Sequence, residues 1–371
     1  MRRLQISLIF MLITFFRCSG EPDTYTVEII DGVRHVHNIA TLWGDESKLE
    51  LQFVRQMGGI DETDVNYQFF RVFCVLKDND NNTYVLENGN KRVQKFDPDW
   101  MYMITIGSEG QGPGELEYPY LMDINLDTGI IYVADPGNSR ISMFNLAGVF
   151  TGSILFTQLQ SVRSIRSIGN GNLVTQVITY SVPGQEEQEE KYLLIAVNSK
   201  GEIVNKFGEY LRHEEERIER SRNNVLFETD IDNNIYVTFN YENIVEKYTS
   251  DGRLIFRADR PLNFEVEHKM VYLSSYGRSF PDMVRVSGNI CVDGMGRSWI
   301  STYDSIPEKD ENLDNITDAK RHLHVFDTDG IFLGAVEYPG EEYVLLKIQG
   351  DTAFFTDNDY ITVMEYKIVE K

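Results

Sequence analysis

The feature that most restricts the fold of this chain is an internal repeat. In its two clearest copies, a turn rich in Asp, Asn or Gly precedes a mostly apolar segment, and a second segment of alternating apolar and polar residues follows. Tyr84 and Tyr132 occupy the same place in the two copies and are 48 residues apart, and Phe96 and Phe144 are separated by the same interval. A period of this length is typical of the blades of a β-propeller.

Four further stretches follow the pattern with more variation, which makes six units: residues 78–97, 127–145, 169–201, 232–252, 293–330 and 350–366. The turn residues tolerate left-handed backbone angles or bond their own backbone. The apolar run is a strand buried on both faces, and the alternating strand has one face inward. With a leading and an outer strand, each unit makes a four-stranded antiparallel sheet. The sequence therefore predicts an all-β fold, a six-bladed β-propeller.

The last unit ends at Lys371 without an outer strand of its own. Residues 49–58 resemble residues 101–107, which are the outer strand of the first unit. We expect residues 49–58 to pair with residues 361–366 and so close the ring with an N-terminal strand. This closure removes a sheet edge that would otherwise invite aggregation.

The sequence divides the chain into three segments. Residues 1–20 form a signal peptide, residues 21–48 an N-terminal extension, and residues 49–371 the propeller. Within the extension, residues 25–37 form a short hairpin whose turn is Asp31-Gly32.

One repeat resembles a known family closely. Residues 131–141 (IYVADPGNSRI) resemble the core signature of NHL repeats, and residues 107–116, with Pro119, resemble the Gly-rich linker between NHL blades. The resemblance covers about residues 49–369, and the chain is similar to six-bladed propeller lipoproteins of Bacteroidota that have no assigned activity. Asp135 and Arg140 belong to the signature, and we expect them to brace one blade against the next.

The N-terminus predicts export. A basic start is followed by an apolar run from Leu4 to Phe16, which is too short to span a bilayer as a helix. Cys18 then stands where bacterial lipoproteins are acylated, although Phe16-Arg17 replace the small residues of that pattern. Either Cys18 is lipidated, or cleavage occurs nearby and Cys18 is incidental. We expect an outer-membrane or periplasmic lipoprotein whose only membrane contact is this anchor, and otherwise a secreted protein.

Charge and cysteine content limit the partners. The net charge is −23, and so acidic a surface repels nucleic acid, whose binding depends on Lys and Arg. Beyond Cys18, the chain has only Cys74 and Cys291, both within apolar stretches. Two buried free thiols are the favoured interpretation, with one long-range disulfide as the alternative.

Three insertions interrupt the repeat. Residues 181–190 are acidic and predict a loop, residues 209–222 a short charged helix with Glu and Arg three and four apart, and residues 305–320 a polar loop. Loops on a rigid scaffold often carry function, so each is a candidate for binding.

Motifs for chemistry are weak. Residues 78–82 open like a calcium loop, but Thr83 and Gly89 stand where that loop needs Gly and Glu, so a plain turn is favoured. His322 and His324 share one face of a strand and would be half a zinc site, or an ordinary pair. No nucleophile elbow or phosphate-binding loop occurs in the sequence. We therefore assign no catalytic residue, metal or cofactor.

Propellers bind ligands at one mouth of the central channel, where loops from several blades meet. Six aromatic or basic residues lie on the connections that lead into the blades, and their types suit a sugar, peptide or protein: Arg71, Tyr120, Arg163, Tyr180, Tyr276 and Arg278. Two functions remain open. The favoured one is a monomeric, non-catalytic binding or scaffold protein that engages a protein or glycan. The alternative is a propeller enzyme of lactonase or lyase type with a divalent metal in the channel.

Overall fold

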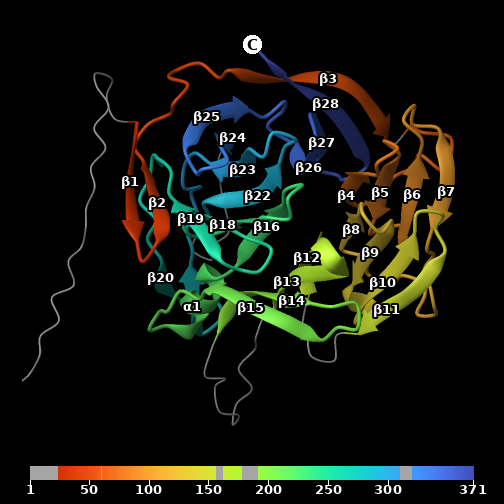
Figure 1. Cartoon of the computed structure of the whole chain (residues 1–371), viewed down its shortest axis with the longest axis horizontal. Coiled ribbons are helices and arrows are strands. Elements are labelled where there is room, and N and C mark those ends of the chain that lie inside the picture. Colours follow the sequence, from red (N-terminus) through yellow and green to blue (C-terminus); the bar gives the residue numbers. More distant parts are fainter. Residues whose placement is uncertain (1–23, 60, 156–161, 178–190, 310–319) are drawn as a thin grey trace, which may run out of the picture.

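The computed structural model describes residues 24–59, 61–155, 162–177, 191–309 and 320–371. Six blades of four antiparallel strands each stand around a central axis (Figure 1), and two N-terminal strands extend the sheet of one blade to six strands. The innermost strands pack against one another in chain order, and the last of them returns to the first. The predicted all-β, six-bladed propeller is confirmed.

Each blade contains four strands, ordered from the innermost to the outermost. Blades 1 to 3 comprise β4 (Val72–Lys77), β5 (Thr83–Glu87), β6 (Arg92–Phe96) and β7 (Tyr102–Ile106); β8 (Leu121–Asn125), β9 (Ile130–Asp135), β10 (Arg140–Asn145) and β11 (Phe150–Leu155); and β12 (Val162–Ile168), β13 (Asn172–Val177), β14 (Tyr192–Val197) and β15 (Ile203–Glu209).

Blades 4 to 6 follow the same order, except that the outermost strand of blade 6 comes from near the start of the chain. They comprise β16 (Val225–Thr229), β17 (Ile235–Phe239), β18 (Val245–Tyr248) and β19 (Leu254–Ala258); β22 (Ser287–Val292), β23 (Ser298–Tyr303), β24 (Arg321–Phe326) and β25 (Phe332–Glu337); and β26 (Val344–Gln349), β27 (Thr352–Thr356), β28 (Thr362–Glu370) and β3 (Leu49–Gly58). Two short 3-10 turns, η1 (Pro136–Asn138) and η2 (Gly169–Gly171), complete blades 2 and 3.

The Asp-rich turns join the first and second strands of the blades. The Asp78 carboxylate accepts hydrogen bonds from the backbone N–H groups of Asp80 and Asn82 at 3.0 and 2.9 Å. It also accepts one from the buried Tyr84 hydroxyl at 2.9 Å. Asp293 repeats this arrangement, with Trp299 in place of the tyrosine. Residues 78–82 therefore form a turn, because the Asp78 oxygens are already used by the backbone and side chains of that turn.

The hydrophobic core lies between neighbouring blades. The described residues form six buried clusters, and each joins two adjacent blades around the ring. Large side chains from the second strands supply much of this packing: Tyr84, Tyr132, Tyr236, Trp299 and Phe354 are all fully buried. Each blade is therefore stabilised by contacts with both of its neighbours, and all of these contacts form only in a closed ring.

The predicted N-terminal closure is confirmed. Strand β3 pairs antiparallel with β28, from Gly58 opposite Thr362 to Leu49 opposite Glu370. Leu49 is buried in the cluster that joins blades 5 and 6. Arg55 adds an ion pair to Glu365 at 3.1 Å. The outer edge of β28 is thus covered by a strand from the other end of the sequence.

The predicted hairpin in the N-terminal extension is present as β1 (Tyr25–Ile30) and β2 (Val33–Asn38). Its docking was not predicted: β2 pairs in parallel with β19 and extends the sheet of blade 4. The buried Asn38 amide holds this position, because it donates to the backbone oxygens of Asp259 and Gly330 and accepts from the Phe332 N–H.

Cys74 and Cys291 are free and buried, so the prediction of two separate thiols is confirmed. They lie in the innermost strands of blades 1 and 5. Burial raises the pKa of both thiols, that of Cys291 to about 12. Neither sulfur is therefore a ready nucleophile at neutral pH.

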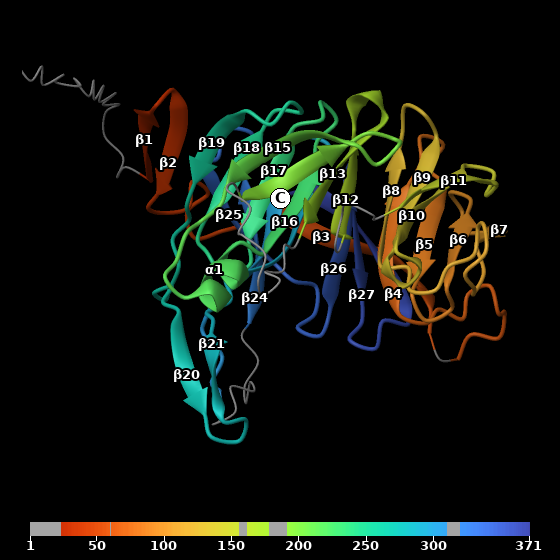
Figure 2. The same cartoon turned by 90° about the horizontal axis from the view of Figure 1, so that it is seen from below.

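The insertions gather on the side of the ring where the innermost strands begin, which we call the loop face. Helix α1 (Glu216–Arg222) precedes β16, and a hairpin of β20 (Lys269–Leu273) and β21 (Arg278–Asp282) precedes β22. Figure 2 shows this hairpin projecting beyond the ring beside α1. The predicted helix over 209–222 is shorter than expected: Glu209 ends β15, residues 210–215 form no helix, and α1 begins at Glu216. Among the described residues, no helix is long and apolar enough to cross a membrane.

Candidate functional site

Three charged side chains from innermost strands meet in the centre of the ring: Arg166 of β12, Glu228 of β16 and Lys347 of β26. Arg166 Nε lies 2.7 Å from Glu228 Oε1, and Lys347 Nζ lies 2.5 Å from Glu228 Oε2. Blades 4 and 6 are not neighbours, so the Lys347–Glu228 pair spans the central channel. We call these three residues the channel cluster.

The channel cluster is buried, and its charges depend on one another. Burial by itself would raise the pKa of Glu228, but the charges of Arg166 and Lys347 and their hydrogen bonds outweigh it and lower the pKa from 4.5 to about 2. The carboxylate therefore stays ionised at every physiological pH. Beside it, Asp123 of β8 accepts hydrogen bonds from the backbone N–H and the hydroxyl of Ser167, both at 2.6 Å.

The mouth of the channel on the loop face carries an aromatic group. Phe73 is the extra residue of a β-bulge in β4, a device that re-aims a side chain. Its ring makes edge contacts with Tyr120 at 5.5 Å and Tyr360 at 6.1 Å between centroids, and the Arg71 guanidinium lies 5.5 Å from it. Tyr118 stacks on Tyr120 at 6.5 Å. We call these five residues the mouth cluster.

The repeat signature holds the loop that carries Tyr118 and Tyr120. The Asp135 carboxylate accepts the Tyr118 N–H at 2.7 Å, and Arg140 donates to the carbonyls of Gly112 and Glu115 at 2.6 and 2.7 Å. The expected bracing role is therefore present as contacts between blade 2 and the linker from blade 1. It positions two tyrosines that are each about two-fifths exposed, at 39% and 43%.

The six residues predicted for the mouth separate into three groups. Arg71 and Tyr120 meet at the channel mouth, as expected. Tyr276 and Arg278 lie on the hairpin that projects from the ring, where both contact Phe280. The sequence predicts a position at the mouth because both residues precede an innermost strand. In the structure, however, this part of the chain forms its own two-stranded sheet, β20 with β21. Tyr180, the side chain of Arg163 and the lipidation candidate Cys18 lie outside the described residues, as do residues 1–20 and 181–190.

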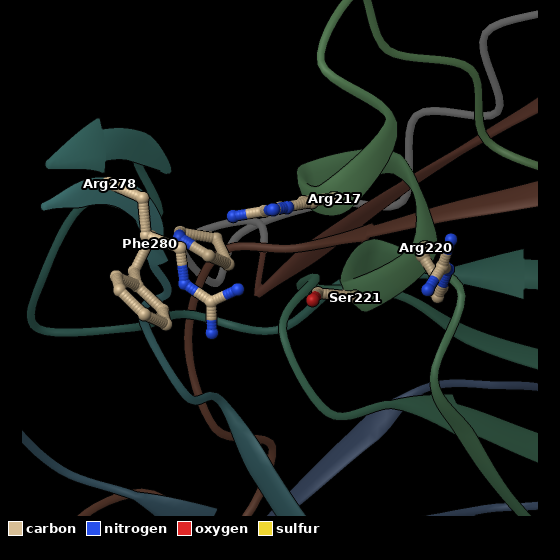
Figure 3. Close-up of a pocket in the computed structure, with 6 residues that line it drawn as sticks. Arg217, Arg220, Ser221, Arg278 and Phe280 are labelled. Carbon is tan, nitrogen blue, oxygen red and sulfur yellow. The ribbon is translucent and has the colours of Figure 1, made fainter. Parts of the chain in front are cut away.

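A cavity of about 280 Å³ lies between α1 and β21. Its lining residues are Arg217, Arg220, Ser221, Arg278, Phe280 and Pro281. Figure 3 shows Arg217 and Arg278 extending into the gap between the helix and the hairpin, with Ser221 facing it from the helix, whereas Arg220 lies on the other side of the helix. We call this the arginine pocket.

The hairpin is fixed at its base by a buried arginine. Arg260 is 2% exposed and its Nη2 donates to the Ser287 hydroxyl at 2.5 Å, while Nε and Nη1 have no hydrogen-bond partner among the residues that the structure describes. Burial lowers the pKa of Arg260 to about 9. This contact ties the start of the insertion to β22.

The two histidines of β24 have separate environments. His322 Nδ1 lies 2.8 Å from an Asp304 oxygen. His324 packs against Phe332, and burial, followed by the charge of Arg260, lowers its pKa well below the usual value. Within the part of the chain that the structure describes, no three His, Cys, Asp or Glu side chains are grouped so that they could hold a metal ion.

Sequence reasoning missed the channel cluster, and of the residues that line the arginine pocket it named only Arg278 as a site residue. Glu228 and Lys347 are charged residues inside short, mostly apolar strands, which was an available signal, whereas Arg166 lies in a strand of mixed polarity. The leading strand of each unit had no signature of its own, however, so these residues were not brought together. Arg217 and Phe280 gave no separate signal.

Two solved structures from Bacteroides have the same fold. A member of the DUF4221 family from Bacteroides vulgatus has a TM-score of 0.59 at 13% identity, covering 87% of this chain and 99% of that chain. A candidate exported protein from Bacteroides fragilis also has a TM-score of 0.59 at 13% identity, covering 88% and 96%. A streptogramin B lyase structure has a TM-score of 0.50 at 12% identity, covering 89% and 100%. At such low identity these likenesses show the fold alone.

Comparison of the amino-acid sequence with protein families identifies the family of this chain. No curated protein matches the chain. Residues 70–274, which run from the first blade to the hairpin before the fifth, match the family described as DUF5128, 6-bladed beta-propeller. This match spans more than half of the chain and agrees with the observed ring of blades. The protein therefore belongs to the DUF5128 family of six-bladed β-propellers.

Proposed function

We propose that this chain is an exported, non-catalytic binding or scaffold protein that engages a protein or glycan partner through its loop face. The mouth cluster is the observation that carries the proposal. It presents exposed tyrosines beside Arg71, which pairs with no carboxylate among the described residues. Tyr and Arg are the residue types that supply most binding energy at interfaces.

The channel supports binding at the face of the ring. A ligand that entered the centre would have to displace the Lys347–Glu228 pair, and breaking a buried ion pair costs several kcal/mol, about 3–5. A ligand that stays on the loop face leaves this pair intact. The insertions and exposed aromatic residues on that face are consistent with this placement.

Export rests on the N-terminal sequence and is supported by the Bacteroides fragilis neighbour. The finer assignments belong to the same proposal: NHL-type repeats, a lipid anchor at Cys18 and a monomeric state. Mass spectrometry of the native N-terminus tests the anchor. An acylated Cys18 supports it, whereas an unmodified N-terminus beyond residue 18 rules it out.

Loss of the stacked tyrosines is expected to weaken partner binding. The ligand is first identified with the wild-type protein, on a glycan array or on an array of purified proteins. The double variant Tyr118→Ala/Tyr120→Ala should then bind this ligand at least about tenfold more weakly, since hot-spot truncations typically cost about 2 kcal/mol or more. Ile231→Ala is the matched control. Ile231 is 95% exposed in a turn on the face opposite the loop face. Equal affinities for both variants would contradict the proposal.

Metal analysis separates this function from a propeller enzyme of lactonase or lyase type. We expect purified protein, dialysed without chelator, to hold well under one divalent ion per chain by inductively coupled plasma mass spectrometry. One tightly bound Ca or Zn per chain would favour the enzyme instead.

A further inference from the structure

The arginine pocket joins two insertions that the repeat does not require. Arg217 comes from α1, before blade 4, and Arg278 from the hairpin before blade 5. Arg217 Nη1 donates to the Ser279 carbonyl at 2.7 Å, which fastens the helix to the hairpin. The pocket is thus bounded on two sides by elements that are held together.

Its charge is opposite to that of the molecule. The chain carries 58 acidic and 35 basic residues. Nevertheless, neither Arg217 nor Arg278 forms an ion pair with any described residue. The nearby carboxylates are already engaged: Glu216 pairs with Arg220 at 2.8 Å, and Asp282 pairs with Lys309 at 2.5 Å and Lys269 at 3.9 Å. Two guanidinium groups therefore face the cavity without a counter-charge from the described part of the chain.

Arg278 is oriented for recognition. Its guanidinium lies over the Phe280 ring at 4.7 Å, and Tyr276 packs against the same ring at 5.3 Å. A guanidinium stacked in this way keeps its edge N–H groups available, and these match the two oxygens of a carboxylate. Phe280 and Pro281 supply an apolar wall beside the charged groups.

We propose that the arginine pocket binds the carboxylate of an acidic sugar residue, a uronic acid; this inference rests on the proposed binding function. The carboxylate accepts N–H groups of Arg278 and Arg217, and the carbon face of the sugar ring lies against Phe280 and Pro281. Ser221 provides a hydroxyl for the ring oxygens. A cavity of about 280 Å³ suits one such ring.

The shape of this region favours a chain-like ligand over a folded protein surface. The hairpin projects beyond the ring beside α1 (Figure 2), and residues of both elements line the cavity. A broad protein interface of standard size is spread over about 800 Å² on each partner, whereas this cavity of about 280 Å³ between two short elements has room for a single small group. The end of a glycan reaches this cavity. An acidic peptide end is the competing occupant, and the test includes it.

The test is isothermal titration calorimetry, with ligand-observed NMR for weak ligands. The probes are D-galacturonate, its uncharged methyl ester, and an N-acetylated dipeptide with a free carboxylate. We expect galacturonate to bind at least about tenfold more tightly than either of the others, a difference of about 1.4 kcal/mol. Equal binding of the ester, tighter binding of the peptide, or no binding of galacturonate would each overturn the proposal.

Variants locate the site. Arg278→Gln and Arg217→Gln should each weaken galacturonate binding at least about tenfold, and Arg278→Lys should restore only part of it, because Lys lacks the planar fork. Arg253→Gln is the control, since it removes the same charge from an exposed turn of blade 4. Equal weakening by Arg253→Gln would show a general charge effect and overturn the site. Galacturonate tests the arginine pocket and the partner ligand tests the mouth cluster, so failure of one proposal is distinguishable from failure of the other.

Discussion

Replacing Glu228 with Gln is expected to lower the free energy of unfolding by about 3–5 kcal/mol at pH 7, because the substitution leaves two buried cations without a counter-charge. Arg166 and Lys347 both direct their charge at this one carboxylate, from blades 3 and 6. Urea unfolding followed by tryptophan fluorescence measures the change. A loss below about 1 kcal/mol would show that the channel cluster does not hold these blades together.

The matched control removes all three charges at once. Apolar side chains of similar size often replace a buried ion group at no cost or with a gain in stability. We therefore expect the triple variant Arg166→Met/Glu228→Leu/Lys347→Met to be close to the wild type in stability and well above Glu228→Gln. This comparison separates the cost of orphaned charges from the cost of any change in packing.

The same group makes stability depend on pH. The folded-state pKa of Glu228, about 2, is lower than its ordinary value of 4.5. The contribution of Glu228 is therefore fully present above about pH 4.5 and is lost as the pH falls towards 2. Between these limits the wild type should lose about 3 kcal/mol more stability than Glu228→Gln. An equal loss of unfolding free energy in the two proteins as the pH falls from 4.5 to about 2 would contradict this assignment.

Removal of residues 1–58 is expected to prevent the formation of a soluble ring. Without β3, the long strand β28 would present an unpaired edge, and such edges promote aggregation. The cluster between blades 5 and 6 would also lose Leu49. Size-exclusion chromatography and circular dichroism should show aggregated or unfolded protein. A chain that lacks only residues 1–23 is the control and should fold. Equal melting of the two would contradict the role of β3.

Much of the ring was predictable because its signals are local. The turn around Asp78 and the buried strand that contains Tyr84 indicate a blade within a short stretch of sequence, and the pattern recurs. The closing strand was predictable because residues 49–58 resemble an outer strand and the last unit lacks one. The hairpin of β1 and β2 had its turn at Asp31-Gly32, but its docking on β19 depends on side chains such as Asn38, whose partners are more than 200 residues away.

The candidate sites were only partly predictable, because they depend on how the ring brings distant segments together. Arg71 and Tyr120 are identified by their positions before innermost strands. Phe73, which contacts both, lies in an apolar run of the sequence, and nothing there distinguishes it from a core residue. Glu228 and Lys347 meet across the channel although 119 residues separate them. Arg278 lies on the projecting hairpin and not at the channel mouth, and no repeat signal in the sequence marks this hairpin.

The closure of the six-bladed ring by β3 is tested most directly by one engineered disulfide. Gln52 and Lys367 are exposed and directly opposite each other in the pairing of β3 with β28. Directly opposite residues have Cα atoms about 4.5–5.5 Å apart, within the range that a disulfide bridges. In a Cys18→Ser background, oxidised Gln52→Cys/Lys367→Cys protein should form an intramolecular disulfide that mass spectrometry of its peptides identifies, whereas Gln52→Cys/Arg253→Cys should not. Free thiols at positions 52 and 367, or disulfides only between molecules, would contradict the closed ring.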